Sequence, residues 1–138
     1  MQEMVAHKNG FQPQGCNFTI PGSAITAGGG SQMGNISPFA LKFNRTIVAG
    51  SSNTVSVGGF ITGGGHGILS GKYGLGADNV LQIELVTADG DIVTANECQN
   101  QDLFWAMRGV CRLFIPKNMK IQEANHFLCR AAAQRSAS

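Results

Sequence analysis

The chain has 138 residues, of which 43% are apolar and only 13% are charged, and its formal net charge is +2. A chain of this length forms one domain and buries roughly two-thirds of the surface of its unfolded state. The small net charge argues against a nucleic-acid partner, and no apolar run approaches the ~20 residues that a membrane helix needs. The four cysteines lack the C-x-x-C spacing of zinc or thioredoxin-type sites. We therefore expect one globular domain with no metal centre, nucleic-acid partner or membrane span.

Composition divides this domain near its C-terminus. All 19 glycines lie between Gly10 and Gly109, whereas residues 110–138 contain five Lys or Arg and a single Glu. Such a step marks a boundary between unlike segments. Residues 110–138 are either a basic C-terminal helix or tail, or a divergent segment that never belonged to the ancestral domain. The codons of Val110-Cys111 fit a 5′ splice donor, so translation of a retained intron is one hypothesis for this segment.

The first half of the chain predicts short elements separated by turns. Residues 1–23 are polar and rich in Pro and Gly, which predicts a loop. They also lack the apolar core of a signal peptide. Residues 24–27 are predicted to form a short strand. Ser37-Pro38 predicts a helix over 38–43 that starts at the proline and places Phe39 and Phe43 on one face.

A glycine-dense region follows two further short predicted strands, one over 46–49 and one at Val55 and Val57. Each glycine costs about 1 kcal/mol in a helix, so residues 58–76 are predicted to form a wandering loop. Its interleaved apolar residues argue against a solvated linker. Without Cβ atoms, successive backbone N–H groups can converge on an anion such as a pyrophosphate. His66, inside this loop, is either a solvent-facing side chain or one held at a bound ligand.

The clearest pattern lies between residues 81 and 109. Leu81, Ile83 and Leu85 alternate with polar residues, as in a half-buried strand, and Asp89-Gly90 predicts a hairpin turn before a return strand over 92–94. Asp102 is predicted to cap a helix over 103–108 that stops at Gly109. Because this helix is apolar almost all round, we expect it to be buried.

Residues 54–80 carry a resemblance to a known family. They read T-V-S-V-G-G-F-I-T-G-G-G-H-G-I-L-S-G-K-Y-G-L-G-A-D-N-V. This resembles the FAD-binding domain of the p-cresol methylhydroxylase (PCMH) and vanillyl-alcohol oxidase type, most of all its berberine-bridge-enzyme-like and fungal FAD-linked branches. There the loop reads roughly T-V-G-V-G-G-x-x-x-G-G-G-x-G-x-L-x-R-K-Y-G-L-A-A-D-N-V. Residues 86–90 and 102–109, the latter D-L-F-W-A-M-R-G, continue the match in register.

The resemblance implies an α+β fold in which residues 24–109 form part of a PCMH-type FAD-binding domain, mostly its second subdomain. It implies FAD as cofactor, and oxidation of a small organic substrate with dioxygen as acceptor. Tyr73, Asp78 and Asn79 would brace the glycine loop against the strand that follows. The residues implied to line or support the cofactor are Val55, Gly58, Gly59, Gly63, Gly64, Gly65, His66, Gly67, Tyr73, Asp78 and Asn79. No catalytic or metal-binding residue is implied.

Departures from the family pattern limit the expected activity. The upstream R-S-G-G-H-S loop, whose histidine often bonds to the flavin, has no counterpart, and Ser52 stands where a second flavin-linking cysteine often occurs. The later glycine run and the substrate domain are also missing. We therefore expect family membership without independent catalysis. The alternatives are a non-catalytic fragment that binds a flavin nucleotide or a partner, and a product without a stable fold.

Three Asn-x-Ser/Thr triplets, at Asn17, Asn35 and Asn44, match the acceptor pattern for N-glycosylation. They matter only in a secreted protein. Pro38 directly follows the second triplet and weakens it. The resemblance implies secretion for full-length relatives, so the triplets are a mild indication of an exported ancestor.

Overall fold

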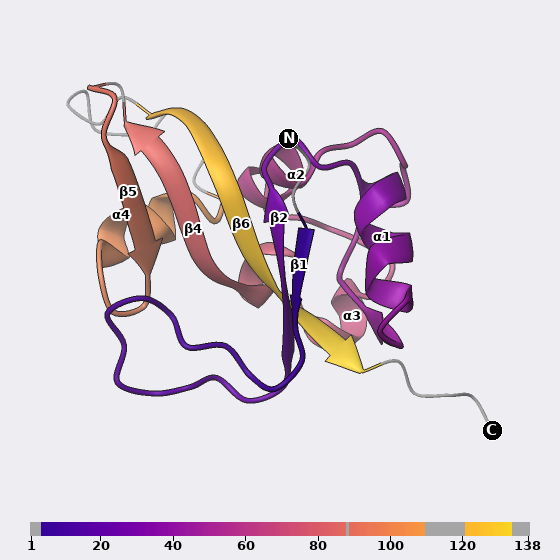
Figure 1. Ribbon diagram of the computed structural model, residues 1–138. Helices are drawn as coiled ribbons and strands as arrows, with labels where there is room; N and C mark the ends of the chain where they lie inside the picture. The colour runs from indigo at the N-terminus through magenta and orange to yellow at the C-terminus, as the bar shows by residue number, and fades with distance from the viewer. Residues whose placement is uncertain (1–3, 88, 110–120, 134–138) are drawn as a thin grey trace.

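The computed structural model describes residues 4–87, 89–109 and 121–133, the last range by its backbone alone. Within these residues one sheet has the strand order β1-β2-β6-β4-β5, with β3 paired to β6 off this path (Figure 1). All of its pairings are antiparallel. The strands are β1 Met4–His7, β2 Ser23–Gly28, β3 Arg45–Thr46, β4 Val80–Thr87, β5 Ile92–Asn96 and β6 Ile121–Ala133.

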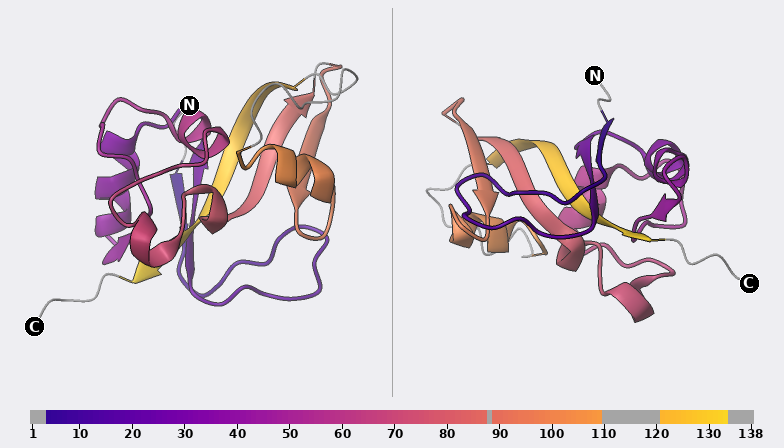
Figure 2. Two further views of the ribbon diagram at one scale, coloured as in Figure 1. Left: turned by 180° about the vertical axis from the view of Figure 1, so that it is seen from behind. Right: turned by 60° about the horizontal axis from the view of Figure 1, so that its bottom comes forward.

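Helices cover one face of this sheet, as the view from behind shows (Figure 2). They are α1 Met33–Leu41, α2 Val57–Thr62, α3 Ser70–Tyr73 and α4 Gln101–Ala106, with a 3₁₀ turn at Ala77–Asn79. The core joins this face of the sheet to α1, α2 and α4. Its largest fully buried apolar side chains are Phe104, Ile25, Ile36, Ile61, Ile83, Leu85 and Val57. Among the described residues, no helix is both long and apolar enough to cross a membrane.

The predicted hairpin is confirmed. β4 and β5 pair antiparallel, Leu85 opposite Val93, and Gly90 in the turn takes φ +92°. Ile83 and Leu85 are fully buried as expected, but Leu81 is not. The register against β6 shifts between Val80 and Gln82, so Leu81 lies in a bulge and Val80 takes the buried position. A period-of-two pattern cannot reveal such an inserted residue.

The prediction for the first helix is right that Phe39 and Phe43 meet, and wrong about both ends, because α1 ends at Leu41 and Phe43 lies in the turn after it. Phe39 and Phe43 make an edge-to-face contact with ring centroids 5.2 Å apart. However, α1 begins at Met33, which leaves Pro38 inside the helix. The early start is possible because the carbonyl oxygens of Val55 and Asn53 accept the first N–H groups of the helix, at 2.9 and 3.0 Å. These partners are distant in sequence, so the local pattern does not show them.

Three other local predictions differ from the structure. Residues 1–23 hold a strand, β1, which the polar composition hid, and the strand expected over 46–49 is confined to β3. The third difference concerns α4, which begins at Gln101 after Asn100, a residue with φ +50°, so Asp102 lies in the first turn and does not cap the helix. The side chain of Trp105 is 65% exposed, so α4 buries one face and is not enclosed all round.

β6 comes from the segment expected to be a divergent tail. It lies between β2 and β4, where Phe127 is opposite Ala27 on one side and Ile83 on the other. Residues 121–133 thereby complete the middle of the sheet. Residues 110–120 and 134–138 lie outside the described residues, and the retained-intron hypothesis for 110–138 stays a prediction.

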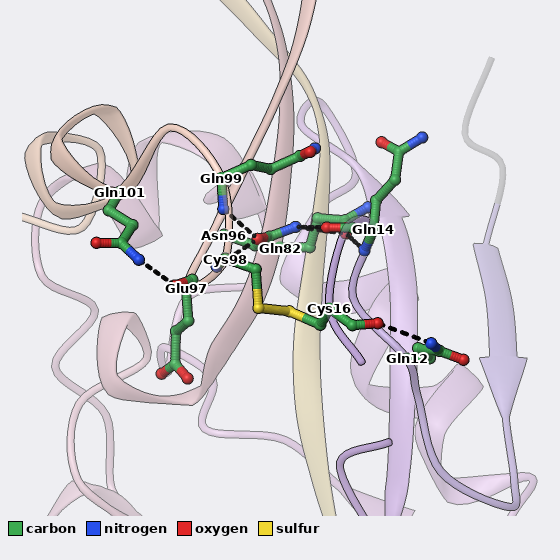
Figure 3. The surroundings of a disulfide bond; sticks show 9 residues. All are labelled: Gln12, Gln14, Cys16, Gln82, Asn96, Glu97, Cys98, Gln99 and Gln101. Carbon is green, nitrogen blue, oxygen red and sulfur yellow. Dashed lines mark hydrogen bonds between the residues drawn. A yellow bond between two sulfur atoms is a disulfide. The ribbon is translucent and has the colours of Figure 1, made fainter. Parts of the chain in front are cut away.

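A disulfide between Cys16 and Cys98 holds the loop over residues 8–22 to the chain just after β5 (Figure 3). Cys16 and Cys98 are 82 positions apart in sequence, and their Cα atoms are 5.5 Å apart. Beside them the fully buried Asn96 donates from Nδ2 to the Gln14 carbonyl oxygen at 2.9 Å and to Gln82 Oε1 at 3.1 Å. Its Oδ1 accepts the N–H groups of Cys98 and Gln99. The cysteine spacing gave no sign of this pairing.

Candidate cofactor-binding site

The glycine-rich region begins as a helix, contrary to the loop and strand expected there. α2 starts at Val57, and its first two N–H groups donate to the carbonyl oxygens of Ser31 and Gly29 at 2.9 and 2.8 Å. Val57 and Ile61 are buried against the sheet. These tertiary bonds and this burial outweigh the cost of glycine in a helix, which is about 1 kcal/mol per residue.

After α2 the chain turns through Gly64 and Gly65, with φ of +92° and +77°. Their carbonyl oxygens accept the N–H groups of Ala77 at 3.1 Å and Gly76 at 2.7 Å. The two bonds tie the glycine loop to the 3₁₀ turn before β4. Left-handed backbone of this kind favours glycine, which explains part of the composition of the loop.

Close packing explains the glycines at two further points. A Cβ atom at Gly67 would overlap the carbonyl oxygen of Ala49, and one at Gly65 would lie 2.9 Å from the Cα atom of Gly76. By contrast, a Cβ atom at Gly64 would meet nothing within 4 Å, and one at Gly59 would meet only Ser56 Oγ, at 3.9 Å. Gly59 and Gly64 therefore leave backbone open to an approaching molecule.

Most of the N–H groups expected to converge on an anion have partners inside the protein. Those of Gly58, Gly63 and Gly64 donate to the carbonyl oxygens of Gly29, Gly59 and Ile61. The N–H of Gly67 donates to Ser70 Oγ at 2.9 Å. A ligand at this loop would thus contact a compact backbone surface in which most of these N–H groups are already hydrogen-bonded within the protein.

Tyr73, Asp78 and Asn79, which were expected to brace the glycine loop, make hydrogen bonds within residues 73–79, and Tyr73 takes part through its carbonyl oxygen. Asp78 Oδ2 accepts the N–H of Leu75 at 2.8 Å. Asn79 Nδ2 donates to the carbonyl oxygens of Tyr73 at 2.9 Å and Leu75 at 2.8 Å. Together with Gly74 at φ +79°, these bonds close the turn that leads from α3 into β4.

His66 and Val55 lie at the surface on either side of α2. The His66 side chain is exposed, and that of Val55 is partly exposed while its carbonyl oxygen caps α1. The predicted site residues therefore occupy two connected stretches, 55–67 and 73–79. The structure brings the two stretches together through the bonds of Gly64 and Gly65.

An open cleft of about 390 Å³ lies beside these stretches, and four of its five lining residues are ones that the sequence analysis does not assign to the site. Its lining residues are Ala77, Asp78, Trp105, Arg108 and Gly109. A Cβ atom at Gly109 would lie 3.6 Å from the Cα atom of Gly64, so the cleft adjoins the open glycine. The guanidinium of Arg108 lies over the Phe104 ring, 4.1 Å from its centroid.

Trp105 and Arg108 stand in the D-L-F-W-A-M-R-G motif that carried part of the resemblance. The sequence predicts a buried helix for this motif and gives no site role to any residue in it. An aromatic ring, a guanidinium and open backbone together suit a ligand that combines flat rings with anionic groups. Within the described residues, no three His, Cys, Asp or Glu side chains are grouped so that they could hold a metal ion.

Comparison with known proteins defines the class to which this site belongs. The family model described as FAD binding domain matches residues 16–96. The chain is 46% identical over 110 residues to the FAD-linked oxidoreductase phmC of Phaeosphaeria nodorum, covering 79% of this chain and 25% of the relative. It is 49% identical over 104 residues to the aurantioclavine synthase cnsA of Penicillium expansum, covering 72% and 22%.

Solved structures agree with the sequence matches. The VAO-type flavoprotein MtVAO615 of Myceliophthora thermophila superposes with a TM-score of 0.78 at 32% identity, covering 95% of this chain and 22% of that one. The chain belongs to the family of FAD-linked oxidoreductases with a PCMH-type FAD-binding domain, related to vanillyl-alcohol oxidase and the berberine-bridge-like enzymes. Its α+β fold matches part of that domain, and the chain spans about a quarter or less of the length of these relatives.

Proposed function

We propose that this chain supplies one wall of an FAD site in an oxidoreductase and is not an independent catalyst. The observation that carries the proposal is the open backbone of Gly64 beside the cleft of Trp105 and Arg108, together with the open backbone of Gly59 in α2. These are the features that fit a flat, anionic cofactor. By family resemblance the chain corresponds mostly to the second subdomain of the FAD-binding domain.

When bound, FAD would supply the redox chemistry, which in a whole relative is oxidation of a small organic substrate with dioxygen as acceptor. The residues of this chain would place the cofactor. Gly59 and Gly64 would allow it to approach the main chain, with Val55 and His66 at the rim. The internal bonds of Gly58, Gly63, Gly65 and Gly67 would keep the loop compact, and Tyr73, Asp78 and Asn79 would brace it.

The sequence contains a single Trp, Trp105, which is exposed at the cleft and is therefore a built-in probe. Purified chain is titrated with FAD while Trp105 fluorescence is recorded, and the mixture is then passed through gel filtration and scanned between about 350 and 500 nm. A saturable quench and a flavin band that co-elutes with the protein are the expected results. A chain that keeps its fold by circular dichroism and gives neither signal refutes the proposal.

A matched pair of variants separates binding from folding. Gly59 and Gly71 both lie in helices, and a Cβ atom at either would meet nothing closer than 3.9 Å. Alanine at either position should therefore leave the fold intact. Gly59→Ala should weaken FAD binding at least several-fold, because the new methyl group would occupy the open space beside Gly59 that FAD is proposed to approach. Gly71→Ala should leave FAD binding unchanged. Equal affinities would mean that FAD does not approach Gly59.

A second candidate function, binding of a partner chain, is favoured by large apolar side chains that are exposed to solvent. Ile68 is 86% exposed and stands one residue after Gly67, and Trp105 lies at the cleft. Exposed apolar groups of this size commonly mark interaction surfaces. Self-association in gel filtration that disappears in Ile68→Ser, with no effect on FAD binding, would support this alternative.

A further inference from the structure

The three N-glycosylation triplets occupy different places in the fold. Asn17 lies in the loop 8–22, Asn35 in α1, and Asn44 in the turn between α1 and β3. All three asparagine residues are exposed. Exposure alone does not show which of the three asparagines carries a glycan. The structure around each triplet has to separate them.

The disulfide bears on the compartment in which the chain folds. Cys16 directly precedes Asn17 and is bonded to Cys98. Disulfides form and persist mainly in oxidising compartments such as the secretory pathway, and are rare in the cytosol. That pathway is also where Asn-x-Ser/Thr triplets receive glycans. The disulfide is therefore a structural reason, independent of the triplets themselves, to expect that the triplets are glycosylated.

The local backbone separates two of the triplets from the third. Residues 17–19 are all exposed, and 17 and 18 form a bend. Asn44 itself has φ +55° and stands in a turn, while Arg45 and Thr46 of its triplet form the two-residue strand β3. Both acceptor asparagines therefore lie in irregular backbone. Asn35 instead lies inside α1, where the middle residue of its triplet, Ile36, is only 1% exposed and Pro38 follows the hydroxyl residue.

We propose that Asn17 and Asn44 carry N-linked glycans and that Asn35 does not. In this transfer the carboxamide nitrogen of the asparagine forms a bond to C1 of an oligosaccharide carried on a polyprenyl pyrophosphate. The bond from C1 to the pyrophosphate breaks, the lipid pyrophosphate leaves, and a base of the transferase takes the amide proton. The third residue of each triplet, Thr19 or Thr46, provides the required hydroxyl. This proposal does not depend on FAD binding.

The test counts the glycans that microsomes add to the full chain. The chain is translated behind a cleavable signal peptide, the protease-protected fraction is collected, and the mobility steps removed by an N-glycosidase are counted. Two steps are expected. Asn17→Gln and Asn44→Gln should each remove one step, and the matched control Asn35→Gln should remove none. Thr46→Ser should keep the step at Asn44, whereas Thr46→Ala should abolish it.

This count is made on all protected chains. Pro38 directly follows the Asn35 triplet in folded and unfolded chains alike, so a variant that misfolds still gives a result. No glycan on the protected chain, or a step lost in Asn35→Gln, overturns the proposal. A second measurement uses protein isolated from the cells that naturally produce it. Glycosidase treatment in heavy-oxygen water converts glycosylated asparagine to labelled aspartate, which peptide mass spectrometry locates. Label at positions 17 and 44 is expected, and its absence from both refutes the proposal.

Discussion

Breaking the Cys16–Cys98 disulfide should remove a large share of the stability of this chain. The two cysteines are 82 positions apart, and chain-entropy arguments give about 4.5 kcal/mol for closing a loop of that size. Single domains are typically stable by about 5–15 kcal/mol. The loss should therefore bring the chain close to its unfolding threshold at room temperature, with the loop 8–22 the first part to detach.

The assay is urea unfolding followed by far-UV circular dichroism, for the wild type and for the double variant Cys16→Ser, Cys98→Ser, each with and without a thiol reductant. With a slope of about 1.5 kcal/mol per M, the expected loss lowers the midpoint by about 3 M. Reductant should lower the midpoint of the wild type by the same amount and leave that of the double variant unchanged. The double variant thus controls for the other two cysteines.

A midpoint shift below about 0.5 M in the double variant would refute this reasoning. It would mean that the unfolded chain without the disulfide is already compact, so that the disulfide restricts it little. Alternatively, the polar contacts of Asn96 would hold the loop 8–22 without the disulfide. The variant Asn96→Ala distinguishes these cases. It removes the donor to Gln14 and Gln82 but leaves both cysteines, and should cost about 1–3 kcal/mol if the contacts matter.

Three further substitutions test the core, the loop and the brace by the same urea assay. Ile83→Ala should lose about 2–5 kcal/mol, because Ile83 is 0% exposed in the centre of the sheet, and a loss below 1 kcal/mol would contradict that burial. Gly67→Ala should destabilise the fold because its Cβ would overlap the Ala49 carbonyl oxygen, whereas Gly71→Ala should be neutral or stabilising by up to about 1 kcal/mol. Equal midpoints for these two variants would contradict the close approach. Asn79→Ala should cost about 1–3 kcal/mol by removing two hydrogen bonds, and an unchanged midpoint would show that the turn holds without them.

Elements stabilised by local signals could be predicted from the sequence. The β4–β5 hairpin depends on alternation and on Asp89-Gly90, both of which are visible in a short window. The strand β2 and the contact between Phe39 and Phe43 were also found in this way. Their main determinants lie within a few residues of each element.

Elements stabilised from a distance could not be predicted. α2 contains two glycines near its start and forms because carbonyl groups of the turn after β2 accept its first N–H groups. β6 lies between strands that are far away in sequence, so its place depends on pairing that no local pattern encodes. The same holds for Cys16 and Cys98, since four cysteines alone permit several pairings.

The glycines of the candidate site also fall into two groups, one that packing within the fold explains and one that it does not. The resemblance implies cofactor contact alike for six glycines of this region, Gly58, Gly59, Gly63, Gly64, Gly65 and Gly67. The structure shows that Gly65 and Gly67 are required by packing, whereas Gly59 and Gly64 leave open space. A sequence motif cannot separate these two reasons, because both select the same residue type.

The difference between glycines required by packing and open glycines decides how much the family motif says about function. This matters here because the chain spans about a quarter of the length of its relative. Glycines required by packing would persist in any chain that keeps the fold, whether or not it binds FAD. Gly64 is also favoured by its left-handed backbone, φ +92°, whatever binds there. Gly59 has neither reason within the described residues, so only a bound molecule or a further part of the protein would require glycine at that position. If Gly59→Ala folds normally and FAD binding is unchanged, the motif reflects the fold alone. If binding is lost while the fold is kept, the chain has retained a working part of the cofactor site.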